Sequence, residues 1–230
     1  MKLNFFKLKD TVKSKSWKDV TLKQYYQIRD TMIAQDEYTA FNLIDIIYGI
    51  DSQSLTINKI TPYLRTLDFL KDEPAVVPLK KKYNINGTVY CVDIALPNVT
   101  TGQFVDWRNY LNRGDAQDKM ENILSVFFIP EGHNYGDGYD ITKVQEDLLC
   151  LDYQTIYSAS FFFKKQLEIL SKTFQRSLRK RVKTMKNKTE REQFLEIADA
   201  LDLPSMISCL ISSSTANLQM RSLQTRSDIQ

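Results

Sequence analysis

The chain has 230 residues, of which 43% are hydrophobic and 11% aromatic, and its formal net charge is +3. This length suits one large domain or two small ones, and the hydrophobic content excludes a largely disordered chain. The seven glycines, six prolines and three cysteines exclude a glycine-rich or proline-rich scaffold, and the wide cysteine spacing indicates neither a zinc site nor a disulfide framework.

The N-terminal residues 1–9 alternate lysine with leucine and phenylalanine, and they lack the continuous apolar stretch of a signal peptide. No apolar run reaches the roughly 20 residues that a membrane-spanning helix requires. We therefore expect no membrane insertion. Because the cysteines indicate no disulfide framework, we also expect a reducing compartment. Residues 1–16 are expected to form a basic, extended arm.

Helix signals recur in residues 17–73. Thr21 is a suitable N-cap for a helix over 22–33, and Asp36 for a second helix that stops at Gly49. Thr61 and Pro62 predict the start of a third helix. Leucine, isoleucine and tyrosine recur at helical spacing in each, which predicts three amphipathic helices.

A β-hairpin is predicted at about residues 80–94. Asn86 and Gly87 stand between two runs that favour β-structure. Asn-Gly accepts the positive φ angles of a type I′ turn, which is the common two-residue hairpin connection.

After the hairpin the pattern of the first helices begins again. Residues 19–25 match 98–104 at an offset of 79, residues 42–48 match 122–128 at 80, and residues 55–60 match 139–144 at 84. Three matches in one order predict two similar three-helix halves, 17–73 and 96–154, with an insertion at 131–139 in the second. The alternative is that amphipathic helices with similar caps look alike. Either way the predicted fold class is α+β and predominantly α-helical.

A long amphipathic helix is predicted over residues 155–187, because apolar residues recur at spacings of three and four from Phe163 to Met185. Further C-terminal helices are expected as far as residue 211. Residues 212–230 are rich in serine, threonine and glutamine and are expected to form a polar tail.

The long helix is also strongly basic. Between Lys164 and Arg191 there are eleven basic and two acidic residues, so this segment carries +9 and the remainder of the chain −6. The candidate contact residues are Lys172, Arg176, Arg179, Lys180, Arg181, Lys183, Lys186 and Lys188. They suit phosphate groups of nucleic acid, an acidic protein partner, or a solvated helix face.

No catalytic residues, cofactor or metal site are predicted. His133 is the only histidine, and no Gly-x-Ser-x-Gly motif or phosphate-binding loop occurs. Glu131, Asp137 and Asp140 lie near glycines but lack the spacing of an EF-hand. A non-enzymatic protein is expected.

Four segments resemble proteins of the tail and neck gene clusters of tailed bacteriophages, in particular the crAss-like phages. They are residues 17–28, 85–90, 101–106 and 161–163, and the resemblance covers about residues 17–165. It is a pattern of helix caps and apolar stripes, and it provides no functional residue to carry over.

The resemblance implies a structural component of the virion, assembled in the host cytoplasm. A ring or adaptor protein at the portal–tail neck is the first expectation, with a tail assembly chaperone or a packaged cargo protein as alternatives. A DNA-binding protein acting through residues 164–191 is a further alternative. The implied partners are the portal and neighbouring ring or tail subunits, further copies of the chain in a homo-oligomer, and packaged DNA.

Overall fold

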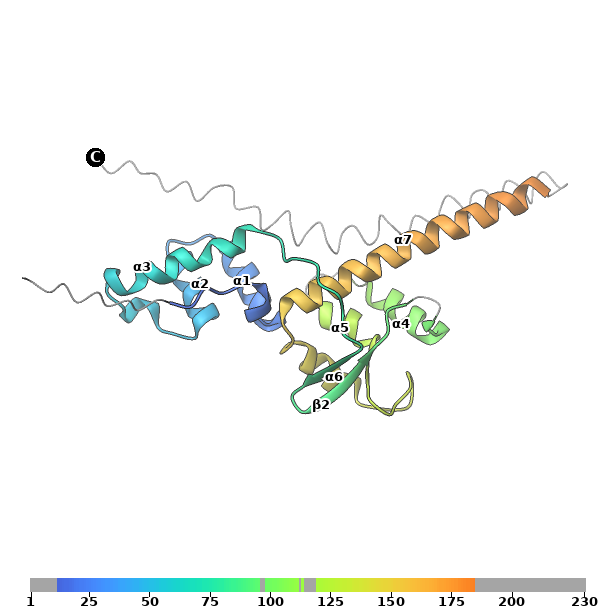
Figure 1. Cartoon of the computed structure of the whole chain (residues 1–230), viewed down its shortest axis with the longest axis horizontal. Coiled ribbons are helices and arrows are strands. Elements are labelled where there is room, and N and C mark those ends of the chain that lie inside the picture. The colour runs from blue at the N-terminus through green and yellow to red at the C-terminus, as the bar shows by residue number, and fades with distance from the viewer. Residues whose placement is uncertain (1–11, 96–97, 112, 114–118, 185–230) are drawn as a thin grey trace, which may run out of the picture.

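The structure is a computed structural model that describes residues 12–95, 98–111, 113 and 119–184. It is a mixed α+β fold and mostly helical, which confirms the predicted class. Figure 1 shows an elongated molecule in which two groups of helices follow one another along the long axis. The long helix α7 starts between the two groups and runs past the second.

The first half is entirely helical. Thr21 and Gln24 form a capping box at its start, in which each side chain accepts a hydrogen bond from the other residue's backbone N–H. Gly49 ends the second α-helix at φ +66°, a left-handed conformation that costs glycine little. The elements are η1 (Trp17–Asp19), α1 (Leu22–Ala34), α2 (Thr39–Tyr48), η2 (Ser52–Ser54), α3 (Ile57–Thr66) and η3 (Leu67–Lys71).

The predicted hairpin is present as β1 (Lys82–Ile85) and β2 (Thr88–Val92). Asn86 and Gly87 form its turn with φ values of +50° and +83°, as the Asn-Gly pair predicts. A third strand, β3 (Phe128–Pro130), pairs antiparallel with β2, so the sheet order is β1-β2-β3.

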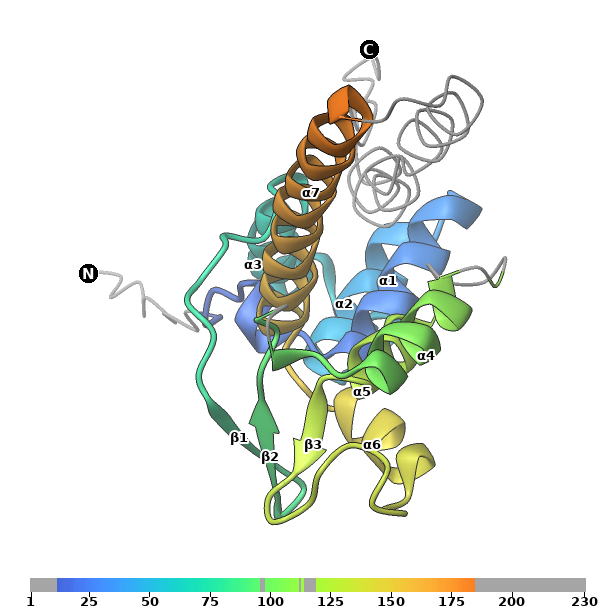
Figure 2. The ribbon, with the colours of Figure 1, turned by 90° about the vertical axis from the view of Figure 1, so that its right-hand side faces the viewer.

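The second half contains α4 (Thr101–Leu111), α5 (Met120–Ser125) and α6 (Ile141–Leu148). Figure 2 shows the sheet on one side of this half, with α6 beside β3. Asp140 caps α6 by accepting hydrogen bonds from the backbone N–H groups of Thr142 and Lys143. Helix α5 packs on α4, on α6 and on β3, and thereby forms the centre of this half.

The two halves share a hydrogen-bond arrangement at matching positions. In the first, the Gln24 amide donates to the carbonyl oxygen of Ile46 at 2.8 Å. In the second, the Gln103 amide donates to the carbonyl oxygen of Val126 at 2.9 Å, and Gln103 forms the same capping box with Thr100. In both halves a capping glutamine therefore ties the first helix to the end of the second. The internal duplication stays a prediction, and it would account for these shared contacts.

One side chain joins the halves directly. The hydroxyl of Tyr26 on α1 donates to Glu121 on α5 at 2.7 Å and accepts from the backbone N–H of Met120 at 2.7 Å. Burial, together with the Glu121 carboxylate, raises the pKa of Tyr26 well above its ordinary value. The tyrosine therefore stays protonated and keeps both hydrogen bonds.

The structure corrects four sequence predictions. Asp36 is not the N-cap of α2, because the N-cap is Tyr38, whose backbone N–H donates to Asp36. The third helix begins at Ile57 after Thr56, not at Thr61, and Pro62 lies inside it. The hairpin does not stand apart between the halves, because β3 joins it to the second half. The 122–128 segment is helical only to Ser125 and then turns into β3.

Other predictions fall wholly or partly outside the described residues. These are the N-terminal arm as far as residue 11, the C-terminal helices beyond residue 184 and the polar tail.

Candidate functional site

Helix α7 (Tyr153–Thr184) is anchored to both halves by aromatic side chains at its start. Tyr153 stacks on Tyr25 of α1 with the ring centroids 3.7 Å apart and the planes 8° from parallel. Ten residues on, Phe163 contacts Phe127 and Trp107 of the second half at centroid distances of 4.4 and 4.9 Å. All five residues are at most 5% exposed, so this part of α7 belongs to the common core.

Beyond this anchor the character of α7 changes. The helix has 32 residues, which makes it about 48 Å long at about 1.5 Å per residue. Figure 1 shows its outer part extending past α4 and α5. Of the apolar stripe predicted from Phe163 to Met185, Phe163 and Val182 are buried. Met185 lies outside the described residues.

Three of the predicted contact residues form one exposed row on this outer part. Lys172, Arg176 and Lys180 are all exposed and recur every four residues, so they lie along the same face of α7. The row spans about 12 Å at about 1.5 Å rise per residue. We call these three residues the basic ridge.

The remaining predicted residues are not all described. Arg179, Arg181 and Lys183 lie in α7, but their side chains are outside the described set. Lys186 and Lys188 lie outside the described residues. Of the eight predicted contact residues, the structure therefore describes the side chains of the basic ridge.

The charge of α7 contrasts with that of the rest of the described chain. The helix contains eight basic residues and one acidic residue, Glu168. Residues 12–163 contain fifteen basic and twenty acidic residues. A basic rod therefore extends from an acidic body, an arrangement that attracts an acidic surface or polyanion over distances up to the Debye length.

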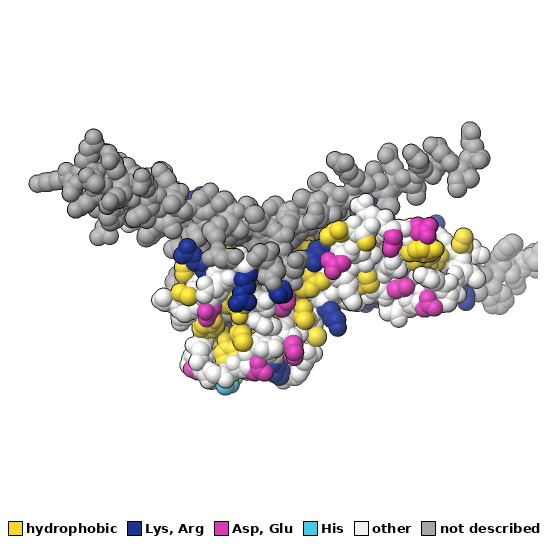
Figure 3. All heavy atoms as spheres, turned by 180° about the vertical axis from the view of Figure 1, so that it is seen from behind, with side chains coloured by type: hydrophobic (Ala, Val, Ile, Leu, Met, Phe, Trp, Pro, Cys, Tyr) yellow, Lys and Arg dark blue, Asp and Glu magenta, His cyan; other side chains and the backbone are white. Residues whose placement is uncertain are grey.

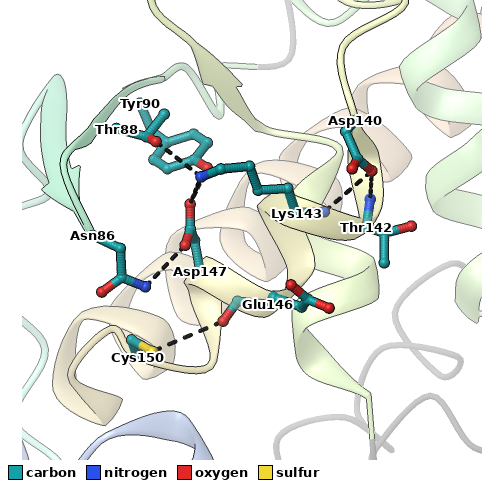
Figure 4. A network of polar contacts seen from close by, with 9 residues as sticks. All are labelled: Asn86, Thr88, Tyr90, Asp140, Thr142, Lys143, Glu146, Asp147 and Cys150. Carbon is teal, nitrogen blue, oxygen red and sulfur yellow. Dashed lines mark hydrogen bonds and ion pairs between the residues drawn. The ribbon is translucent and has the colours of Figure 1, made fainter.

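The sequence did not reveal a second polar cluster, which lies between the hairpin and α6. Figure 4 shows Asp147 of α6 pointing toward the hairpin, where three side chains converge on its carboxylate. The Tyr90 hydroxyl donates to it at 2.5 Å, the Lys143 ammonium at 2.9 Å and the Asn86 amide at 2.9 Å. Lys143 also donates to the Thr88 hydroxyl at 3.0 Å.

This cluster is built to hold a carboxylate in its charged form. Burial raises the pKa of Asp147, but hydrogen bonds from Lys143, Tyr90 and Asn86 outweigh burial and hold that pKa below its ordinary value. Burial and the same carboxylate raise the pKa of Tyr90. Asp147 is only 5% exposed and its oxygens are engaged. The cluster therefore ties the hairpin to α6 and leaves little room for a reactant.

The predicted loop residues do not converge on a metal site. Glu131 pairs with Lys82, Asp137 accepts from the backbone N–H of Asn134, and Asp140 is the N-cap of α6. Within the described ranges no group of three or more histidine, cysteine, aspartate or glutamate side chains is placed to hold a metal ion.

His133 lies in the same loop, with its ring centroid 5.9 Å from that of Tyr139.

In the part of the chain that the structure describes, no helix is long and apolar enough to cross a membrane.

Comparison with known proteins adds no relative to this picture. No protein-family model, curated protein or solved structure matches the chain.

Proposed function

We propose that the chain is a non-enzymatic structural component of a tailed phage particle, a ring or adaptor protein at the portal–tail neck. In this proposal it binds neighbouring virion proteins through the outer part of α7. The observation that supports the proposal is the construction of α7, which is fixed at one end in the core of both halves and carries the basic ridge at the other.

This construction suits contact between subunits for a physical reason. Two aromatic anchors, Tyr153 and Phe163, fix the direction of α7 relative to the body, so the ridge is presented in a defined orientation. A preorganised surface loses less conformational entropy on binding than a flexible arm. A subunit that must be placed accurately beside its neighbours benefits from such rigidity.

The test is the protein composition of purified particles. A ring or adaptor protein is expected in intact particles at a fixed copy number, and it is expected to remain after the DNA has been ejected. Absence from intact particles would overturn the proposal in favour of a tail assembly chaperone. Loss together with the DNA would overturn it in favour of a packaged cargo protein.

A second candidate function is DNA binding through the same helix, which the basic ridge favours. Three exposed cations in a row suit the phosphates of a duplex, which bind basic proteins largely through counterion release. Retention of duplex DNA by the purified chain at physiological salt would support this function. Loss of that retention in the Arg176→Glu/Lys180→Glu variant would assign it to the ridge.

A further inference from the structure

We propose that the basic ridge of one copy docks on an acidic corner in the first half of a second copy, so that the chain associates head to tail. This inference rests on the proposed function and names the partner that α7 meets, which is another copy of the same chain.

The acidic corner is the connection between α1 and α2. Asp36 and Glu37 are exposed in this connection and Asp30 is exposed in the last part of α1, and residues 29–58 contain five acidic residues and one basic residue, Arg29. Asp30 pairs with Arg29, whereas Asp36 accepts hydrogen bonds from its own turn, and all three carboxylates remain on the surface. The corner is thus a local concentration of negative charge.

The same corner exposes apolar side chains. Ile33 is 59% and Tyr38 49% exposed, and both lie between or next to the three acids. On the other surface, Ile169 is 53% exposed and lies one turn before the ridge. Figure 3 shows acidic and hydrophobic side chains close together on the face of the first half that it displays. Each surface therefore offers charge of one sign beside exposed apolar groups, as a small specific interface requires.

The two surfaces of one copy do not meet. The first half and the outer part of α7 lie at opposite ends of the long axis (Figure 1). Helix α7 is held rigidly by Tyr153 and Phe163, so it does not fold back onto the α1–α2 connection. Complementary surfaces that lie apart on one copy can meet only between copies.

A contact between two different patches is heterologous. Heterologous contacts propagate from copy to copy and close into a ring when the rotation between neighbours allows it. Opposite charges at the rim of such a contact accelerate association and select the partner, and they weaken as salt is added. Where this rotation closes, head-to-tail docking of the ridge on the corner yields the ring that the proposed function requires.

Two charge-reversal variants test the inference together. The first, Arg176→Glu/Lys180→Glu, makes the ridge acidic. The second, Asp36→Lys/Glu37→Lys, makes the corner basic. All four side chains are exposed, so both variants are expected to fold, and circular dichroism checks this. Sedimentation velocity of the full chain measures the assembly.

The wild-type chain is expected to form oligomers that dissociate as salt rises, and each variant alone is expected to be monomeric. An equal mixture of the two variants restores assembly, because each reversed surface then meets its opposite on the other variant. The control Lys80→Glu/Lys81→Glu makes the same change in net charge as the ridge variant, at two exposed lysines away from both surfaces, and it is expected to assemble like the wild type.

Monomeric wild-type chain at high concentration and low salt would overturn the inference, as would a mixture that stays monomeric. A loss of duplex DNA binding in the ridge variant, with no change in assembly, would also overturn it. The proposed function fails separately, because it fails only if the chain is absent from purified particles or leaves them with the DNA.

Discussion

The capping glutamines give the sharpest test of how the two halves are built, and Gln103→Ala is the change to make. Gln103 is 4% exposed. Its amide donates to the Val126 carbonyl at 2.9 Å, and its carbonyl oxygen accepts from the Thr100 backbone N–H at 2.9 Å. Alanine leaves both backbone groups without these partners, while it keeps the helix propensity.

The expected loss follows from these two hydrogen bonds. An unsatisfied buried polar group costs about 1–3 kcal/mol, and a lost helix cap about 1 kcal/mol. Water can replace the lost partner at the N-terminus of α4 more readily than at the buried Val126 carbonyl, so the carbonyl accounts for most of the cost. We expect a total loss of about 2–3 kcal/mol in the free energy of unfolding. Urea unfolding followed by circular dichroism measures the free energy of unfolding.

Matched substitutions in the first half complete this test. Gln24 makes the same pair of contacts but is less buried, so Gln24→Ala is expected to lose about 1–2 kcal/mol. Gln27 lies exposed on α1, and Gln27→Ala serves as the control with little change. A Gln103→Ala variant as stable as the control would refute the assignment of these hydrogen bonds to the stability of the halves.

Three further predictions, two for substitutions and one for salt dependence, concern the other features. Asp147→Asn is expected to make the free energy of unfolding depend less on pH in acid. The pKa of Asp147 is lowered in the folded protein, so its carboxylate stabilises the wild type above the unfolded-state pKa of about 3.9. This contribution is lost as the pH falls through the folded-state pKa, and the variant lacks it. Equal acid sensitivity of both proteins in urea titrations would contradict this. Phe163→Ala is expected to cost about 3–5 kcal/mol and to raise amide exchange along the start of α7, because the ring is 5% exposed between two aromatic partners. Amide exchange at the start of α7 that stays as slow in the variant as in the wild type would contradict the anchoring role of Phe163. If the chain binds duplex DNA through Lys172, Arg176 and Lys180, the binding constant is expected to fall about forty-fold between about 50 and 200 mM salt, from a slope of about −0.9 per phosphate. Binding that ignores salt would exclude the ridge as the DNA contact.

The parts of the fold that the sequence predicted are those decided by neighbouring residues. Thr21 with Gln24 signals a capping box within four residues, and Asn86 with Gly87 signals a turn through the φ angles these two residues accept. The basic ridge was predictable for the same reason, since a spacing of four on a long helix defines a face.

The missed features depend on residues that are distant in sequence. Strand β3 is three residues long, and nothing in the run around Phe128 distinguishes a strand from the end of a helix until β2 pairs with it. The Asp147 cluster joins residues 57 and 61 positions apart, so no local pattern announces it. Pro62 suggested a helix start because proline favours the first turn, yet α3 accommodates it in its interior.

Zero-length cross-linking shows whether the basic ridge contacts another subunit. A carbodiimide joins a lysine amine to a carboxylate only where the two touch. Assemblies made from equal amounts of unlabelled and nitrogen-15-labelled chain distinguish contacts between copies from contacts within one.

We expect mixed-isotope cross-links from Lys172 or Lys180 to Asp36 or Glu37. The exposed Lys80 and Lys81 serve as the control, because the carbodiimide should also couple them to carboxylates. If they react and the ridge lysines cross-link only within their own copy, the contact between copies is contradicted.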